Sequence, residues 1–282
     1  MKLSVFMPTI RVHLLKNWYD SLSNACNGIE FEVVTCGPFK PDKELLDLEN
    51  FKWIEDFGCP TRAAQIAAIE CSGDLIYHTV DDVLFFPNEL ANEVNRLDLD
   101  HDEIIAMRYR EGQGHSGTEL SPCYWYSDAS YNPALFKGVK GVWGSCIHFL
   151  MKRDLFVEFG GFDCLFEYLN HSTHDLLYRI QNSKPVKYSL SNNEISSADW
   201  QPDVTGDHAP IHFAQTDHDA YLFKGMWQNE KRSGSVGLDN WNRVSPLWSR
   251  RAEAIEGLEV VRKVTKKVTK KATKKTTKKK AK

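Results

Sequence analysis

Short apolar runs alternate with helical patterns over the first 100 residues, and this alternation constrains the fold more than any other feature. The runs are rich in β-branched and aromatic residues and too short for helices, as in buried strands; they cover residues 3–7, 31–36, 51–54 and 75–80. Helical patterns follow each run, over residues 14–22, 43–48, 60–72 and 88–97, the last with Asn88 as its predicted cap. This order predicts an α/β fold with a mostly parallel sheet.

Three of the predicted strands end in residues suited to ligand binding. The ends are followed by Pro8-Thr9, Gly37-Pro38 and Asp81-Asp82. In open sheets of this kind, ligands bind beyond the carboxyl ends of the strands. We therefore expect the three ends to line one crevice.

Asp81 and Asp82 follow a strand predicted to be buried, where carboxylates are rare unless they have a partner. Hard cations such as Mg²⁺ and Mn²⁺ take oxygen ligands and are often shared with substrate phosphates. The alternative is a solvated turn that caps the next helix. The two residues alone do not decide between these interpretations.

The second half of the chain has weaker periodicity. Strands are predicted over residues 104–108 and 146–151, a helix over 153–159 that stops at Gly160-Gly161, and a further helix within 171–180. Residues 111–141 and 189–210 are predicted to be long loops, which are usually functional or mobile in a compact domain. The second loop ends in a polar cluster that includes His208 and His212, but Pro210 between them argues against a regular helix.

Charge divides the chain into an acidic body and a basic tail. Residues 262–282 carry eleven Lys and one Arg and no acid, which leaves 23 cations against 38 acids in the other 261 residues. Like charges and low complexity predict a disordered tail, and lysine runs of this kind bind anionic surfaces or nucleic acid.

The seven dispersed cysteines, with no Cys-x-x-Cys pair, argue against a disulfide framework and favour a reduced, cytoplasmic protein. No apolar stretch is long enough for a transmembrane segment, and the N-terminus does not resemble a signal peptide.

Four segments in a fixed order resemble the family 2 nucleotide-sugar-dependent glycosyltransferases. They are the opening strand with Pro8-Thr9, the helix from Arg62 through Gly73 into Asp81-Asp82, Gly160-Gly-Phe-Asp followed by Asp175-Leu-Leu-Tyr-Arg179, and the segment 219–227. The resemblance implies a GT-A fold, in which a Rossmann-like nucleotide-binding half adjoins an acceptor-side half. It also implies a metal-dependent, inverting transfer of sugar from a nucleoside-diphosphate sugar to a hydroxyl of a glycan or glycoprotein, with Mn²⁺ or Mg²⁺ as the cofactor.

The resemblance also assigns roles to individual residues. Asp82 takes the metal position, and Val80 replaces the first Asp of the usual Asp-x-Asp. Ser172 and Thr173 stand where the family has Glu-Asp, so the general base is expected at Asp175 or else at His174. The alternatives are a salt bridge from Asp175 to Arg179 and a surface position for His174. The remaining candidates are Pro8, Thr9, Cys36, Gly37, Arg62 and Asp81 for the donor, Trp143 and Gly144 for the acceptor side, and His208 or His212 as a further metal ligand.

The resemblance implies one GT-A-like domain over residues 1–250, with a donor half of about residues 1–110 and an acceptor half of about 111–250, before the tail at 262–282. Two other functions stay open. One is a nucleotidyltransferase or metal-dependent phosphohydrolase on a similar sheet, which the absence of glycine in Pro8-Thr-Ile-Arg-Val-His disfavours. The other is an inactive binding module with a basic tail.

Overall fold

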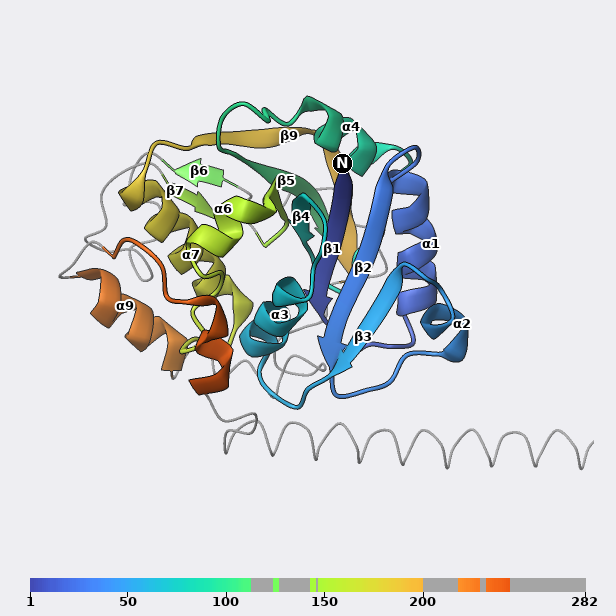
Figure 1. Cartoon of the computed structure of the whole chain (residues 1–282), viewed down its shortest axis with the longest axis horizontal. Coiled ribbons are helices and arrows are strands. Elements are labelled where there is room, and N and C mark those ends of the chain that lie inside the picture. Colours follow the sequence, from blue (N-terminus) through green and yellow to red (C-terminus); the bar gives the residue numbers. More distant parts are fainter. Residues whose placement is uncertain (113–123, 127–142, 146, 200–217, 229–231, 244–282) are drawn as a thin grey trace, which may run out of the picture.

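A seven-stranded, mostly parallel sheet forms the centre of the molecule (Figure 1). The computed structural model describes residues 1–112, 124–126, 143–145, 147–199, 218–228 and 232–243. The strand order is β3-β2-β1-β4-β8-β5-β9, and β8 is antiparallel to both of its neighbours. The strands are β1 (Lys2–Pro8), β2 (Glu30–Gly37), β3 (Phe51–Glu55), β4 (Leu75–His78), β5 (Glu103–Gly112), β8 (Phe149–Lys152) and β9 (Lys187–Asp199). The predicted α/β fold is confirmed.

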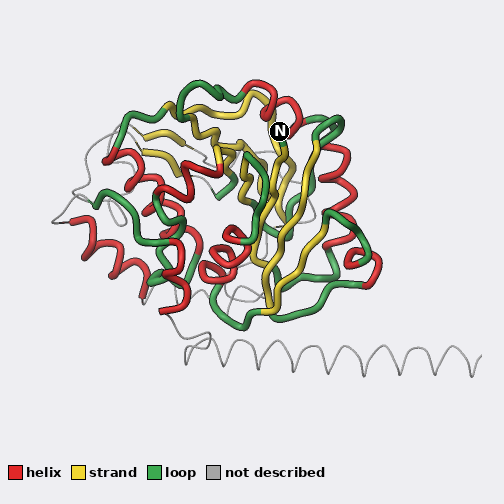
Figure 2. The backbone as a smooth tube through the Cα atoms, in the orientation of Figure 1, coloured by secondary structure: helices red, strands yellow, loops and turns green. Residues whose placement is uncertain are grey.

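Helices cover both faces of this sheet, as Figure 2 shows in red and yellow. One face carries α1 (Leu15–Ala25), α2 (Lys43–Leu46) and α4 (Glu89–Arg96). The other carries α3 (Pro60–Ile69), α6 (Arg153–Glu158) and α7 (Leu169–Ser183). None of the described helices is long and apolar enough to cross a membrane.

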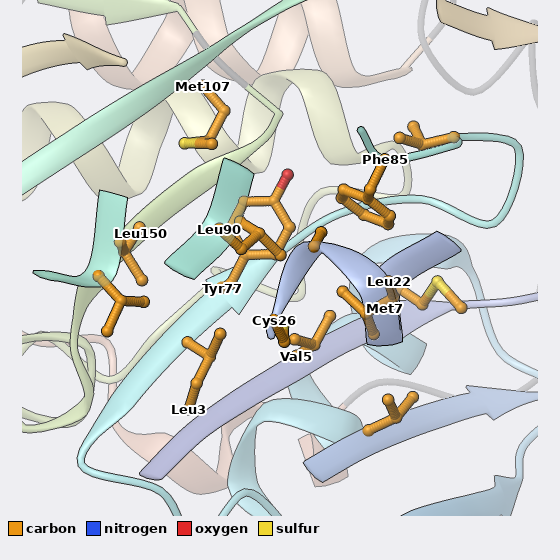
Figure 3. Packing of buried hydrophobic residues seen from close by; sticks show 14 of the residues in the cluster. Leu3, Val5, Met7, Leu22, Cys26, Tyr77, Phe85, Leu90, Met107 and Leu150 are labelled. Atoms are coloured by element: carbon orange, nitrogen blue, oxygen red, sulfur yellow. The ribbon is translucent and has the colours of Figure 1, made fainter. Parts of the chain in front are cut away.

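Successive side chains of each strand point to opposite faces of the sheet, so the buried side chains form two cores, one on each face. Leu3, Val5 and Met7 of β1 point to the face of α1 and α4, where Tyr77 and Leu22 join them (Figure 3). The alternate residues of the same strands, such as Phe6 and Ile76, point to the other face of the sheet and pack on the alanines of α3 and on α6 and α7. Pro60 at the first turn and the Cys59 thiol, which accepts the Arg62 N–H at 3.4 Å, start α3 at the carboxyl edge of the sheet.

The C-terminal part of the described chain lies over α7. Helix α9 (Ala220–Gln228) packs on α7 through Phe223 and Trp227. Residues 232–243, which we call the strap, then run back across Phe159 and end in the 3₁₀ helix η3 (Leu238–Arg243) beside α3. The strap is fixed by Asn240, whose amide donates to Phe162 O (3.0 Å) and accepts from Cys164 N (2.8 Å).

Several local predictions are wrong. Within the predicted loop at 111–141, residues 124–126 form the strand β6 (Tyr124–Tyr126). Residues 189–199 belong to β9 rather than to a loop, because their backbone pairs with β5 at the sheet edge, where polar side chains are tolerated. Asn88 does not cap α4 with its side chain: it takes φ +64°, and its Oδ1 accepts from Asn27 Nδ2 at 3.1 Å. The five described cysteines are all buried, and none of them is disulfide-bonded.

Candidate active site

The ends of β1, β2 and β4 meet at one edge, as the sequence predicts. β1 lies between β2 and β4, and Thr9 N donates to Cys36 O at 2.9 Å just beyond the paired strands. Gly37 permits this approach, since a Cβ there would stand 1.9 Å from the Thr9 carbonyl oxygen. Pro8, Thr9 and Gly37 therefore lie together. The Cys36 side chain instead lies in the core, where burial raises the pKa of its thiol, and only its backbone faces the edge.

Asp81 is the carboxylate that organises this edge. Its Oδ2 accepts the Thr9 hydroxyl (3.0 Å) and the backbone N–H groups of Ile10 and Arg11 (both 2.9 Å). Its Oδ1 accepts the Arg11 guanidinium. Burial acts to raise the pKa of Asp81, but Arg11 and these hydrogen bonds hold it below its usual value. Asp81 is thus an anion that binds the turn after β1.

Asp82 is the carboxylate that fits a divalent cation better. Its side chain is also buried, and its Oδ2 lies 3.2 Å from Arg11 Nη1. Asp81 already accepts four donors from the turn after β1, so a cation at Asp81 would have to displace that turn. Among the described residues no group of three His, Cys, Asp or Glu side chains forms a metal cluster. Asp82 would therefore contribute a single carboxylate to a cation, whose other ligands would have to come from a bound molecule such as a phosphate.

Arg62 lies at the same edge but is bound within the protein. Its guanidinium contacts both oxygens of Asp56, at 3.0 to 3.2 Å, and donates to the Trp241 carbonyl. It also stacks over the Trp241 ring, 5.0 Å from the centroid. Arg62 therefore joins the β3–α3 connection to the strap.

Asp175 is fully buried in α7. Its Oδ2 accepts Arg179 Nε at 2.8 Å, and its Oδ1 accepts Trp227 Nε1 at 3.1 Å and the Arg232 guanidinium. Burial raises the pKa of Asp175, and the two guanidiniums oppose that effect. The Arg179 salt bridge is the alternative that the sequence left open, and it is present.

His174 is buried beside α9 rather than exposed on the surface. Its Nδ1 lies 2.6 Å from Asn170 O, and its ring meets Phe223 edge to face, with centroids 6.4 Å apart. Burial lowers its pKa to about 3, which keeps the imidazole neutral at physiological pH. Its immediate surroundings are those of a packed helix interface.

The other predicted residues lie on β7 or outside the described chain. Trp143 and Gly144 belong to β7 (Trp143–Ser145), which pairs with β6 (Tyr124–Tyr126) and contacts α7. His208, His212 and the tail at 262–282 lie outside the described residues.

Three residues of this edge were missed by sequence reasoning. Arg11 bridges Asp81 and Asp82, Asp56 binds Arg62, and Trp241 covers Arg62 from the strap. The one available signal was a lone arginine just after the Pro8-Thr9 turn. Asp56 and Trp241 carry no local pattern that separates them from surface residues.

Several solved structures that resemble this fold are glycosyltransferases. TarS of S. aureus, residues 1–349 in complex with UDP-GlcNAc, matches with a TM-score of 0.53 and 14% identity over 82% of this chain and 68% of its own. Glucosyl-3-phosphoglycerate synthase from Mycobacterium tuberculosis matches with 0.50 and 15% identity over 80% of each chain. The catalytic domain of Drosophila beta1,4galactosyltransferase 7 matches with 0.50 and 12% identity over 85% of this chain and 83% of its own.

At these identities the likeness establishes the fold, which is that of GT-A-type glycosyltransferases. No family model matches the sequence, and no curated protein matches it. The chain spans 60% of another structure of TarS 1–349 and 37% of a longer TarS chain.

Proposed function

We propose that this protein is a metal-dependent, inverting glycosyltransferase of the family 2 type. It moves a sugar from a nucleoside-diphosphate sugar to a hydroxyl of a glycan or glycoprotein. The observation that carries the proposal is the convergence of Thr9, Gly37, Asp81 and Asp82 at the carboxyl edge of a glycosyltransferase fold. Residues 1–110 form the donor half in this proposal, and residues 111–250 form the acceptor half.

Each part of the edge has a distinct task in the reaction. The cation, when bound, neutralises the charge that develops on the leaving diphosphate. Asp82 binds it, while Asp81 fixes the turn at Thr9 and Arg11 that borders the donor. Trp143 and Gly144 line the acceptor side in this proposal, and His208 or His212 supplies a further metal ligand.

The proton of the acceptor hydroxyl must go to a general base, and Asp175 is our first candidate and His174 our second. The contacts of both residues also fit a structural role, since Asp175 binds two arginines and a tryptophan and His174 packs on Phe223. A variant at Asp175, described in the Discussion, separates catalysis from structure.

Replacing Asp82 by alanine tests the proposal most directly. We expect Asp82→Ala to lower sugar transfer and donor hydrolysis about 10²-fold or more, because the diphosphate loses its cation. The assay is release of nucleoside diphosphate from UDP-, GDP- and dTDP-sugars with and without MnCl₂, starting with UDP-GlcNAc because TarS binds it. The matched control is Asp47→Ala, an exposed acid paired with Lys43. Full activity in Asp82→Ala would exclude this function.

A catalytically inactive binding module is the second candidate. The burial of Asp175 and His174 within the α7–α9 interface favours it, since neither side chain is exposed in the described structure. Calorimetry separates the two functions: a binding module takes up a nucleotide sugar in the presence of MnCl₂, but releases no nucleoside diphosphate in the assay above.

The lysine-rich tail at 262–282 has a separate proposed role, binding to an anionic surface or nucleic acid. Its support is charge alone, twelve cations without an acid. Binding to duplex DNA and to anionic vesicles is expected to weaken steeply with salt and to disappear when residues 262–282 are removed.

The cytoplasm is the proposed location, supported by the five described cysteines, which form no disulfide among themselves.

A further inference from the structure

Arg11 stands between the two adjacent carboxylates at the sheet edge. Its Nη1 contacts Asp81 Oδ1 and also lies 3.2 Å from Asp82 Oδ2. All three side chains are at least nine-tenths buried, with relative exposures of 7% for Arg11, 4% for Asp81 and 7% for Asp82. One guanidinium therefore contacts two neighbouring carboxylates that are largely shielded from water.

The contacts of Arg11 with the two carboxylates are not equivalent. Arg11 binds Asp81 through its guanidinium and also through its backbone N–H at 2.9 Å, and the neighbouring Ile10 N–H and Thr9 hydroxyl bind the same carboxylate. Its approach to Asp82, at 3.2 Å, is longer and is made by the side chain. The bonds to Asp81 include backbone N–H groups of the turn after β1, whereas the 3.2 Å contact with Asp82 is made by the guanidinium.

Charge favours the exchange of Arg11 for a divalent cation at Asp82. Two carboxylates and one guanidinium leave the group with a net charge of −1, which repels a diphosphate but attracts a divalent cation. A cation that binds Asp82 also lies near the positive guanidinium, which it repels. The cation and Nη1 therefore compete for the same oxygen.

We propose that Arg11 is a positioning residue that holds Asp82 in the cation-free protein, and that a divalent cation replaces it at Asp82 while Arg11 stays on Asp81. The inference rests on the proposed function only in assigning the cation to the donor's diphosphate. By linkage, separating Arg11 from Asp82 lowers the apparent affinity for the cation. The protein thus binds the cation weakly alone and more tightly when a diphosphate shares it.

Titration of the full-length protein with MnCl₂ tests this competition, with calorimetry and the electron paramagnetic resonance of free Mn²⁺ as readouts. Arg11→Met keeps much of the side-chain volume and removes the charge, so we expect Mn²⁺ to bind at least about tenfold more tightly than in the wild type. Arg11→Lys presents one compact charge in place of a planar fork. We expect it to stay with Asp81, so that Mn²⁺ binds several-fold more tightly than in the wild type.

Two controls isolate the effect. Lys16→Met removes the same charge from α1, where Lys16 pairs with the exposed Asp20, and is expected to leave Mn²⁺ affinity unchanged. Asp82→Asn is expected to abolish the weak Mn²⁺ binding of the wild type and, together with Arg11→Met, the tighter binding of that variant.

Equal or weaker Mn²⁺ binding in folded Arg11→Met overturns the proposal. If that variant does not fold, the comparison of Arg11→Lys with the wild type decides, and equal or weaker binding in Arg11→Lys has the same meaning. The readout is independent of sugar transfer. A protein that shows the competition but never releases nucleoside diphosphate refutes the proposed function and leaves the role of Arg11 intact.

Discussion

At the scale of single residues, the buried carboxylates of this protein mainly hold backbone and arginine groups in place. Asp81 fixes the turn after β1, and Asp175 binds Arg179 and Arg232. Asp219 accepts the backbone N–H groups of Glu167 and Tyr168, at 3.0 and 2.7 Å, just before α7 begins. Sequence patterns identify such buried acids as unusual. They do not show whether the groups that bind these acids belong to the protein or to a ligand.

Asp175→Asn separates the two roles of Asp175. The neutral amide leaves Arg179 without its buried anion and removes one of the two carboxylates that bind Arg232, the other being Asp163. We therefore expect the free energy of unfolding to fall by about 3 kcal/mol. Urea denaturation measures this change, with Asp47→Asn, at an exposed ion pair, as the control. If Asp175 is also the base, the folded variant still binds the donor but sugar transfer is lost. Unchanged stability with unchanged transfer contradicts both roles.

At the scale of elements, the turn between α6 and α7 is held against α3 by side-chain hydrogen bonds. Gly160 and Gly161 have φ of +74° and +69°, and the Gln65 side chain of α3 binds both Gly160 O and Phe162 N at 2.9 Å. A Cβ on Gly161 would lie 2.3 Å from Gln65 Oε1 and 2.5 Å from a ring carbon of Phe156. The turn therefore needs glycine for its conformation and also for its space.

Gly161→Ala and Gly28→Ala separate these two requirements. Gly28 has φ +79°, and a Cβ added there would meet nothing within 4 Å, so its replacement costs about 1 kcal/mol, the penalty of the left-handed conformation. Gly161→Ala adds the collision with Gln65 and Phe156, for a total loss of about 3 kcal/mol. Thermal and urea unfolding measure both variants. Equal losses would show that space at Gly161 does not matter.

The predictions for individual elements succeeded where local patterns dominate. Four strands and four helices of the first 100 residues are close to their predicted places, because β-branched runs and helical spacing signal burial directly. β9 was missed because its polar sequence resembles a loop, and only its pairing with β5 makes it a strand. The start of α7 at Leu169 was also missed, since a segment with three polar residues and two histidines has weak periodicity.

At the scale of the whole molecule, the interior holds several histidines that the fold keeps neutral. His78 and His148 lie on β4 and next to β8, and His174 lies on α7. Burial is the main cause that lowers their pKa values, to about 4, 3 and 3 respectively. In the unfolded chain each would titrate near its ordinary value of about 6.5.

Stability should therefore fall as the pH drops below about 6.5. The unfolded state binds protons there that the folded histidines do not, so each costs about 2 kcal/mol by pH 5. Urea denaturation between pH 8 and pH 5 measures the slope. His174→Phe is expected to flatten it, whereas His101→Asn, at a histidine with 77% side-chain exposure, is not. An unchanged slope in His174→Phe would show that His174 is protonated in the folded protein.

The meeting of strand ends at one edge was predictable from the alternation of elements, and the structure confirms it. The contacts that complete that edge could not be predicted from the sequence. Arg62 and Trp241 are 179 residues apart in sequence, and Gln65 binds both the Gly160 turn and the strap. Such contacts depend on tertiary packing, which no local period encodes. The roles of the individual site residues stay predictions for the experiments above.

The antiparallel insertion of β8 between β4 and β5 has a consequence for the order in which the protein can be assembled during synthesis. β4 meets its second neighbour only when Phe149–Lys152 arrive, about 70 residues after His78. Until then β4 presents one open edge to other chains in the cell and β5 presents two, because its partners β8 and β9 both follow it in sequence. Such edges favour aggregation. A nascent chain of this protein is therefore most in need of a chaperone between the emergence of β5 and that of β8.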